Sequence, residues 1–200
     1  MASESSGVHR LQESADSWFV RHVGALKSVM RIVFGIVWGI DGFLKFQPGV
    51  SDSLAGMISD ASNGQPGWLQ PWFSFWSQTV SGNPAFFMTT IGLLELALAF
   101  ALIFGFLRKI AYTGGFFLSM IIWSVPEGFG GAYGPGSTDI GTGIIYAFCF
   151  LFLLILNAAF GPICWSLDAL LERRWPGWRR IAELRGEPES GPRSPRTQSL

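Results

Sequence analysis

Four long apolar runs limit what this chain can fold into more than any other feature of its sequence. They cover residues 29–46, 86–107, 110–125 and 140–160. A helix needs about 20 consecutive apolar residues to cross the hydrocarbon core of a bilayer. The third run is short, and only Arg108 and Lys109 separate it from the second, so these two runs are expected to form a tight helical hairpin. The pattern predicts an all-α integral membrane protein, a bundle of four transmembrane helices.

The composition agrees with a membrane protein and argues against one class of partner. Charged residues make up 14% of the chain, whereas about 25% is usual in soluble domains. The formal net charge is zero, so no nucleic-acid partner is expected. The four runs are expected to lie in membrane lipid.

The basic residues predict how the chain is oriented in the membrane. The loops 47–85 and 126–139 contain no Lys or Arg. Cytoplasmic loops carry an excess of these residues, so both termini are expected in the cytoplasm and both loops outside. Lys45 is the one exception to this pattern. The other basic residues are Arg10, Arg21, Lys27, Arg31, Arg108, Lys109, Arg173, Arg174, Arg179, Arg180, Arg185, Arg193 and Arg196.

Three regions follow from these boundaries. Residues 1–28 are expected to form a cytoplasmic N-terminal tail and a helix on the membrane surface. Residues 29–165 are expected to form the four-helix transmembrane domain. Residues 166–200 begin with WSLDALLERRWPGWRR, which is typical of a basic, tryptophan-bearing surface helix, and end in a tail expected to be disordered.

The long outer loop, 47–85, is expected to contain two short helices. Ser51 or Ser53 would cap the first helix, which ends near Asn63. Pro71 suits the first turn of the second helix. Indole rings prefer the headgroup region, so the tryptophan-bearing segment QPGWLQPWFSFWSQTV is expected to lie on the outer surface or to fold over the bundle as a lid. Its tryptophans are spaced four residues apart, at Trp68, Trp72 and Trp76.

Charged residues inside the apolar runs are the candidate functional residues. Asp41 and Lys45 lie four residues apart in the first run, close enough to pair on one helix face. Glu95 lies nine residues into the second run, ~14 Å deep. Glu127 and Asp139 flank the third and fourth runs at the same outer side. An ionisable residue inside a membrane is a functional candidate, so we expect an outward-facing polar cavity lined by Asp41, Lys45 and Glu95.

A purely structural interpretation of the same residues stays open. Asp41 and Lys45 can form a structural ion pair, and a protonated Glu95 can form a hydrogen bond between helices. Gly35 and Gly39 form a G-x-x-x-G motif, which lets membrane helices approach closely and carries no chemistry.

The sequence argues against a metal centre. The two histidines, His9 and His22, lie outside the four runs, and the two cysteines form no cluster. We therefore expect no haem, iron–sulfur cluster or metal site. If the protein takes part in redox chemistry, a quinone or a partner subunit would have to supply the electron-carrying group.

Two stretches resemble a known family. The first run, in MRIVFGIVWGIDGFLKF, and the second, in IGLLELALAFALIFGFLRK, are similar to the DoxX/DoxD-like membrane proteins. The resemblance covers about residues 28–160. Asp41 and the tryptophan-rich loop depart from the family pattern. The residues that carry the resemblance are Arg31, Gly35, Gly42, Lys45, Gly92, Glu95, Gly105 and Arg108.

This resemblance implies a four-helix bundle in a bacterial plasma membrane, related to the small subunit of thiosulfate:quinone oxidoreductase. It suggests a membrane subunit of a redox system that passes electrons to quinone from thiosulfate or another sulfur compound. An oxidoreductase or sulfurtransferase would be its partner subunit. The oligomeric state is left open.

Within this hypothesis each candidate residue has a role. Glu95 would relay a proton, paired Asp41 and Lys45 would complete the catalytic site, and Lys45 would attract an anionic sulfur compound or a quinone oxygen. The tryptophans assigned to quinone binding are Trp38 and Trp123. Substrate binding is assigned to Lys45, Glu127 and Asp139.

Two other functions remain open. The same acidic residues would suit a small proton- or cation-linked transporter. The basic C-terminal segment would suit a non-catalytic membrane anchor for a soluble oxidoreductase.

Overall fold

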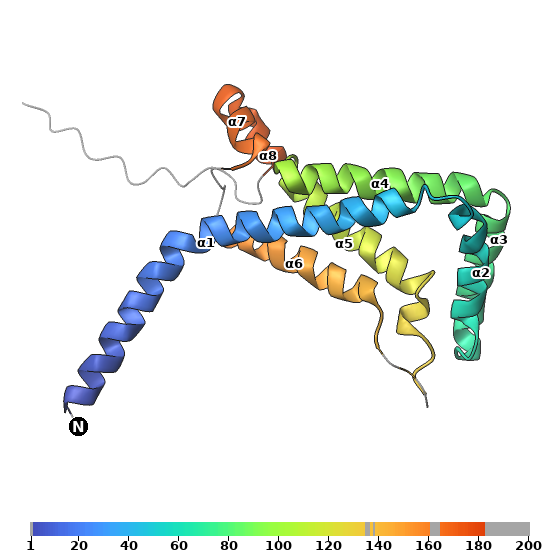
Figure 1. Ribbon diagram of the computed structural model, residues 1–200, viewed down its shortest axis with the longest axis horizontal. Coiled ribbons are helices and arrows are strands. Elements are labelled where there is room, and N and C mark those ends of the chain that lie inside the picture. Colours follow the sequence, from blue (N-terminus) through green and yellow to red (C-terminus); the bar gives the residue numbers. More distant parts are fainter. Residues whose placement is uncertain (1, 135–136, 138, 161–164, 183–200) are drawn as a thin grey trace, which may run out of the picture.

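The protein is an all-helical bundle in the part of the chain that the structure describes. The computed structural model describes residues 2–134, 137, 139–160 and 165–182, and these include no strand. Four long helices run alternately up and down beside one another (Figure 1). They are α1 (Ala2–Leu44), α4 (Pro84–Phe104), α5 (Arg108–Ser124) and α6 (Thr142–Phe160).

The lengths of these helices support a membrane protein. Among the described residues, three segments are long and apolar enough to cross a membrane: His22–Leu44, Pro84–Phe104 and Thr142–Ala159. Helix α5 has 17 residues, so it is ~25 Å long against a hydrocarbon core of about 30 Å. The predicted all-α class is confirmed, and a fourth crossing by α5 stays a prediction.

Helix α1 differs from the expected N-terminal region. The sequence predicted a tail and a separate surface helix over residues 1–28, but one helix runs from Ala2 to Leu44. No proline interrupts this stretch, so nothing in the backbone forces a helix to end there. The N-terminal part of α1 turns away from the bundle (Figure 1).

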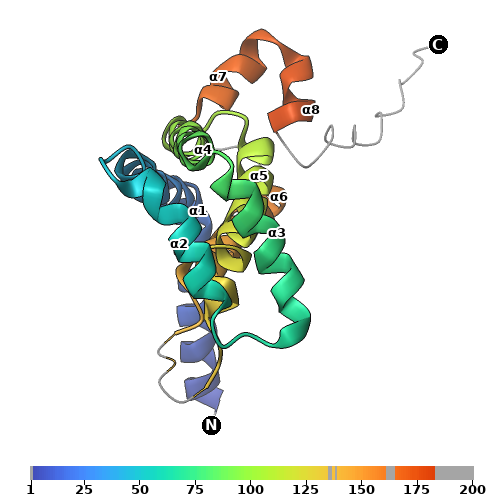
Figure 2. The ribbon, with the colours of Figure 1, turned by 90° about the vertical axis from the view of Figure 1, so that its right-hand side faces the viewer.

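Residues 47–85, the loop expected on the outer side, fold into helices that lie across one end of the bundle. They are α2 (Val50–Ser62), the short 3₁₀ turn η1 (Gly67–Leu69) and α3 (Gln70–Ser81). Figure 2 shows α2 and α3 in front of the bundle when it is viewed along its length. We call this end of the bundle the α2 end.

Two of the three local predictions for this loop are confirmed. Helix α2 ends at Asn63, and Pro71 lies in the first turn of α3. The predicted cap by Ser51 or Ser53 is wrong, because the residue that precedes α2 is Gly49 and no side chain caps the helix. Gly49 has φ 82°, a left-handed conformation that glycine adopts without a steric penalty.

The C-terminal helices lie at the opposite end of the bundle, which we call the α7 end (Figure 1). They are α7 (Leu167–Arg174), the 3₁₀ turn η3 (Pro176–Trp178) and α8 (Arg179–Ala182). The segment after residue 165 is helical as predicted, but it is broken into pieces because α7 ends at Arg174 and Trp175 is extended. Its position on the membrane surface stays a prediction. The predicted disordered tail falls on residues 183–200, which lie outside the described residues.

The helices approach closely at glycines. A Cβ atom on Gly35 of α1 would lie 2.9 Å from the Cβ of Leu102 on α4. A Cβ on Gly39 would be 3.5 Å from the Cβ of Ala99, an ordinary contact. Small residues permit this approach, so the predicted packing role of Gly35 and Gly39 is confirmed. The bundle thus consists of one pair, α1 with α4, and a second pair, α5 with α6.

Gly115 supports a first prediction about stability. A Cβ at Gly115 would lie 2.3 Å from the ring of Phe150, which is fully buried. We expect Gly115→Ala to lower the free energy of unfolding by about 1–3 kcal/mol, as overpacking of a filled core does. Unfolding in mixed detergent micelles, followed by circular dichroism, measures this. Gly114→Ala is the matched control, because a Cβ there meets no atom within 4 Å; equal effects at both positions would contradict the packing argument.

Candidate functional site

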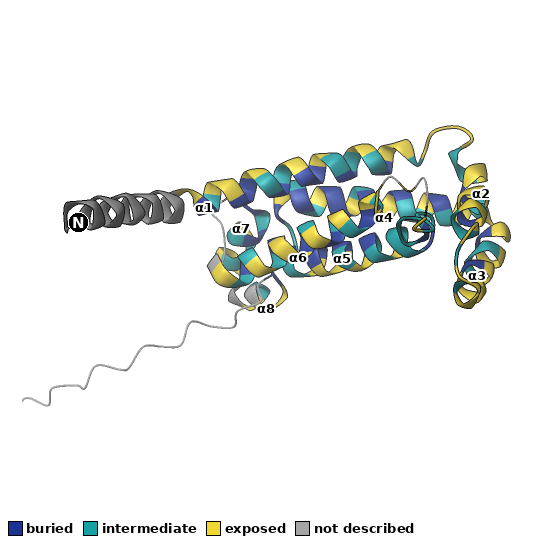
Figure 3. Ribbon diagram, turned by 90° about the horizontal axis from the view of Figure 1, so that it is seen from below, coloured by how far each residue is buried: buried dark blue, intermediate teal, exposed yellow. Residues whose placement is uncertain are grey.

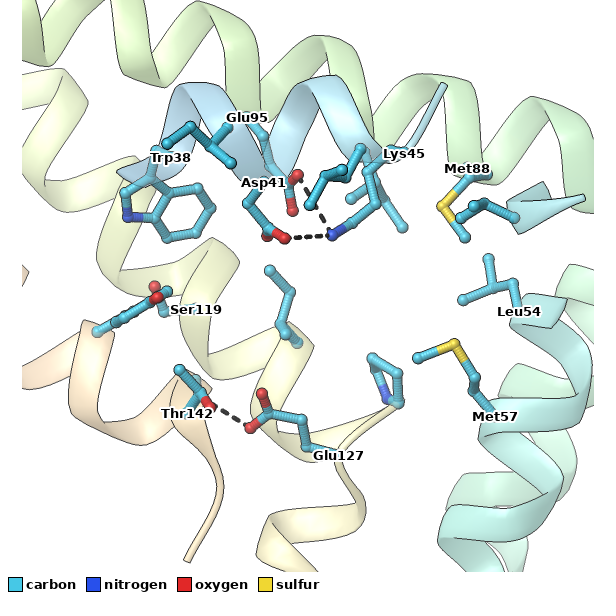
Figure 4. A pocket seen from close by; sticks show the side chains of 18 of the residues that line it. Trp38, Asp41, Lys45, Leu54, Met57, Met88, Glu95, Ser119, Glu127 and Thr142 are labelled. Carbon is cyan, nitrogen blue, oxygen red and sulfur yellow. Dashed lines mark hydrogen bonds and ion pairs between the residues drawn. The ribbon is translucent and has the colours of Figure 1, made fainter. Parts of the chain in front are cut away.

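A pocket of about 470 Å³ lies inside the bundle at its α2 end (Figure 4). Side chains from α1, α2, α4, α5 and α6 line it, and most of its wall is apolar. Ligand-binding pockets of proteins typically have volumes of about 300–1,000 Å³ and apolar walls with a few polar groups. This pocket is therefore large enough to hold a small molecule.

The structure brings Asp41, Lys45 and Glu95 together on one side of this pocket. Lys45 Nζ lies 3.0 Å from Asp41 Oδ1 and 3.6 Å from Glu95 Oε2 (Figure 4). The side chain of Glu95 is fully buried, whereas 41% of the Asp41 side chain is exposed. The sequence predicted Asp41 as the partner of Lys45, and the structure adds Glu95 as a second partner. Their catalytic role stays a prediction.

Two glycines explain how Glu95 reaches Lys45 from another helix. A Cβ on Gly42 of α1 would lie 3.0 Å from the Cβ of Glu95, and a Cβ on Gly92 of α4 would lie 3.1 Å from the Cβ of Lys45. The backbones of α1 and α4 are therefore close at the level of the charged residues. Any larger side chain at Gly42 or Gly92 would push Lys45 and Glu95 apart.

Three polar side chains on the pocket wall have atoms without a hydrogen-bond partner in the described part of the protein. They are the indole nitrogen of Trp38, the hydroxyl of Ser119 and the carboxyl oxygens of Glu95, of which Oε2 has only the ion pair with Lys45. Buried polar groups nearly always have a partner, and each exception calls for an explanation. Because all three line the same pocket, a polar ligand would satisfy them together.

Of the three residues assigned to substrate binding, two line the pocket and one does not. Lys45 and Glu127 line the pocket. Glu127 Oε2 accepts a hydrogen bond of 2.8 Å from the backbone N–H of Gly143 in the first turn of α6, where a carboxylate also favours the helix dipole. Asp139 does not line this pocket, and its Oδ1 accepts a hydrogen bond from Gly141 N in its own loop.

Of the two tryptophans assigned to quinone binding, one lines the pocket and the other does not. Trp38 is almost fully buried and lines the pocket. Trp123 does not line it; its indole N–H donates to the carbonyl oxygen of Ile140 at 2.7 Å, and its ring packs against Phe129. Trp123 therefore holds the loop before α6 in place.

Helix α2 contributes pocket residues that sequence reasoning missed. Leu54 and Met57 line the pocket at the α2 end (Figure 4). Leu54 is buried against Phe73 of α3 and Met88 of α4. The two positions predicted for the tryptophan-bearing segment concern α3, which contributes no residue to this pocket, and they stay predictions. The sequence indicates that α2 has an apolar face. It does not indicate which helices that face contacts, which are α3 and α4.

A second polar centre lies at the α7 end, where the sequence indicated no candidate site. Arg108, which the sequence places in the link between the second and third apolar runs, is fully buried and forms an ion pair of 3.0 Å between its Nε and Asp168 Oδ2. Its Nη2 lies 3.2 Å from Glu172 Oε1. Asp168 also accepts hydrogen bonds from the backbone N–H groups of Leu107 and Arg108. Asp168 therefore caps the first turn of α5 and fixes α7 to the bundle.

Lys27 and Arg31 are buried at this end as well. They lie near the N-terminal end of the candidate membrane span His22–Leu44. Arg31 Nη2 donates to the carbonyl oxygen of Trp165 at 2.8 Å, and Lys27 Nζ donates to Asn157 Oδ1 at 3.2 Å.

The described part of the chain contains no group of three or more His, Cys, Asp or Glu residues placed to hold a metal ion. The absence of haem and iron–sulfur clusters stays a prediction. The chain matches no family model, no curated protein and no solved structure. The resemblance to DoxX-like proteins therefore stays a prediction that depends on the residues quoted from the first two apolar runs.

Proposed function

We propose that this protein is the membrane subunit of a redox system, similar to DoxX-like proteins, and that it binds a quinone in the pocket at the α2 end. The observation that carries the proposal is the position of Lys45, which lies between Asp41 and Glu95 at an apolar-walled pocket. An apolar wall suits the ring of a quinone, and an ammonium group suits one of its oxygens. The unpaired donor groups of Trp38 and Ser119 fit a ligand that carries acceptor oxygens.

The charges of the pocket favour a neutral ligand over an anionic one. Three carboxyl groups, those of Asp41, Glu95 and Glu127, line it together with one ammonium group, that of Lys45. An anionic ligand would be repelled by these carboxylates, and the repulsion is only weakly screened inside a protein. Quinone therefore suits the pocket better than thiosulfate, and we propose that the sulfur compound or other electron donor acts at a partner oxidoreductase or sulfurtransferase.

The residues of the pocket would supply protons and hydrogen bonds. A bound quinone takes up two electrons from the reduced partner and two protons, and leaves as quinol. Lys45 would donate a hydrogen bond to one ring oxygen and stabilise the negative charge that develops there. Glu95, in contact with Lys45, would deliver each proton to that side of the pocket. Asp41, whose side chain is 41% exposed, would return protons to Glu95 from water.

We further propose that α5 crosses the membrane as the fourth span, with both termini in the cytoplasm of a bacterial cell. Arg173 and Arg174 are exposed at the α7 end. Lys109, in the first turn of α5, lies at the same end of the bundle. Lys45 is the one basic residue at the α2 end among the described residues. This arrangement follows the excess of basic residues on the cytoplasmic side of membrane proteins.

Quinone carried by the purified protein tests this proposal. The full chain is purified in mild detergent, and bound quinone is extracted and measured by mass spectrometry. We expect wild-type protein to carry quinone and Lys45→Met to lose at least about tenfold in affinity, because a hydrogen bond from a charged donor is worth about 1.5–3 kcal/mol. The matched control Lys109→Met removes the same charge outside the pocket and is expected to keep wild-type binding.

Glu95→Gln separates proton delivery from binding. With the reduced partner present, we expect quinol formation to slow by about 10²–10⁴-fold, the usual contribution of a general acid. Quinone affinity is expected to change little, because glutamine fills the same space. Asp60→Asn, at an exposed position on α2, is the control. Full quinol formation by Glu95→Gln would contradict the proposed role.

A second candidate function is proton- or cation-linked transport, which the excess of carboxyl groups over ammonium groups in the pocket favours. Proteoliposomes of the purified chain alone discriminate between the two functions. Uptake of a cation driven by a pH gradient, together with no retained quinone, would favour transport.

A further inference from the structure

The pocket reaches the surface of the protein between α1 and α6. The backbones of α1 and α6 come close at few positions, because α1 packs on α4 and α6 packs on α5. The rings of Phe34 and Trp38 on α1 still pack against Tyr146 and Phe150 on α6, so the gap lies between these rings and the α2 end. On the two sides of this gap, Ile40 and Leu44 of α1 and Thr142 of α6 line the pocket and are also exposed. Figure 4 shows Asp41 and Lys45 on one side of the pocket and Thr142 on the other.

The surface around this gap is apolar. On α1, large apolar side chains are exposed at Val33, Ile36 and Phe43, and on α6 at Ile145 and Phe148. Figure 3 shows the exposed faces of the long helices along the whole bundle. Helices with such faces meet lipid in a protein of this class. The gap therefore opens toward acyl chains.

The pocket is covered at the α2 end. Val50, Leu54 and Met57 of α2 form its wall there, and Leu54 belongs to the buried cluster that joins α2 to α3 and α4. A ligand that arrives from water along the axis of the bundle would meet this wall. A ligand dissolved in the bilayer would meet an open side.

The polar groups of the pocket form two separate sets. Lys45, Asp41 and Glu95 form one set. Trp38 and Ser119 form the other, with an indole N–H and a hydroxyl that have no hydrogen-bond partner among the described residues, although the two side chains are 1% and 0% exposed. Figure 4 shows Trp38 and Ser119 on the side of the pocket away from Lys45. Both of these unpaired groups can donate a hydrogen bond.

We propose that the ligand is a flat ring with an acceptor oxygen at each end and a long apolar tail, and that it enters sideways from the lipid between α1 and α6. This inference rests on the proposed function and adds the access route and the second contact. One ring oxygen lies at Lys45, and the other accepts from Ser119 and Trp38. The tail stays in the gap beside Ile40 and Thr142.

Photocrosslinking tests the access route. The full chain carries p-benzoylphenylalanine in place of Thr142, or in place of Ile155 as a lipid-facing control on the same helix. It is reconstituted with a benzoquinone that has an isoprenoid tail. We expect adducts of the tail at position 142 in excess over position 155, and we expect an excess of the same ring without a tail to remove them.

Two contrary outcomes are distinguishable. If wild-type protein retains no quinone, the proposed function fails and this inference fails with it. If it retains quinone but positions 142 and 155 give equal adducts, sideways access is wrong while the proposed function stands.

Ser119→Ala tests the second contact. We expect quinone to bind about tenfold more weakly, the equivalent of one hydrogen bond, while a ring that lacks the second oxygen binds as it does to wild type. Ser124→Ala, farther along α5 and outside the pocket, is expected to change neither affinity. Equal weakening of both rings by Ser119→Ala would overturn the two-ended arrangement.

Discussion

Replacing Asp168 with alanine is expected to lower the free energy of unfolding by about 3–5 kcal/mol, the cost of breaking a buried ion pair by removing one partner. Asp168 is fully buried, and its carboxylate accepts hydrogen bonds from Leu107 N, Arg108 N, Arg108 Nε and Trp178 Nε1 at 2.9–3.0 Å. Alanine would remove the carboxylate that pairs with the Arg108 Nε and leave the ion pair of its Nη2 with Glu172 among the described residues. Unfolding in mixed detergent micelles, followed by circular dichroism, measures the change.

The same variant is expected to release the C-terminal helices before the bundle unfolds. Besides its carboxylate contacts, Asp168 donates its backbone N–H to Gly105 O at 3.2 Å. Limited proteolysis should therefore cut α7 of Asp168→Ala at protease concentrations that leave wild type intact.

Glu172→Gln is the matched control, because Glu172 contacts the same arginine but is 16% exposed. We expect it to lower stability by less than about 1 kcal/mol, as for partly solvated ion pairs. Equal losses for both variants would show that Asp168 does not fix α7.

Replacing Lys45 with methionine is expected to lower the free energy of unfolding by about 2–3 kcal/mol, somewhat less than the loss of a partner from a fully buried pair. The side chain of Lys45 is 23% exposed, but Glu95 is fully buried. Without the ammonium group, Glu95 would keep an uncompensated charge or a buried carboxyl group with no partner on the pocket wall. This effect concerns folding and is independent of any ligand.

Double variants identify which carboxylate depends on Lys45. Lys45→Met combined with Glu95→Gln is expected to recover most of the lost stability, because no buried charge remains. Lys45→Met combined with Asp41→Asn is expected to recover little, because 41% of the Asp41 side chain is exposed. The differences between single and double variants give the coupling energies directly. If the losses of stability in Lys45→Met and Glu95→Gln simply add in the double variant, the 3.6 Å contact between the two side chains contributes nothing to stability.

These two predictions concern the same kind of interaction at opposite ends of the bundle. Each end holds a buried acid–base contact between helices that are far apart in the sequence: Lys45 with Glu95 at the α2 end and Arg108 with Asp168 at the α7 end. Arg108 and Asp168 are joined by direct hydrogen bonds, which suits a structural role. Lys45 and Glu95 face a pocket, and Glu95 has an oxygen left unpaired, which suits a functional role.

The sequence by itself determined the features that depend on neighbouring residues. Runs of apolar residues predict membrane helices because the length of the run is a local property. The spacing of Asp41 and Lys45 predicts their contact because residues four apart share a helix face, and the structure shows it. Pro71 in the first turn of α3 follows from its missing N–H and fixed φ.

Only the tertiary structure decided which helices share a polar centre. The contact of Lys45 with Glu95 depends on the rotation of α1 and α4 about their axes, which the close approach at Gly42 and Gly92 sets. The burial of Arg108 depends on α7 folding back over the turn before α5. Packing between distant segments fixes these rotations and offsets, and no periodicity within one helix encodes them.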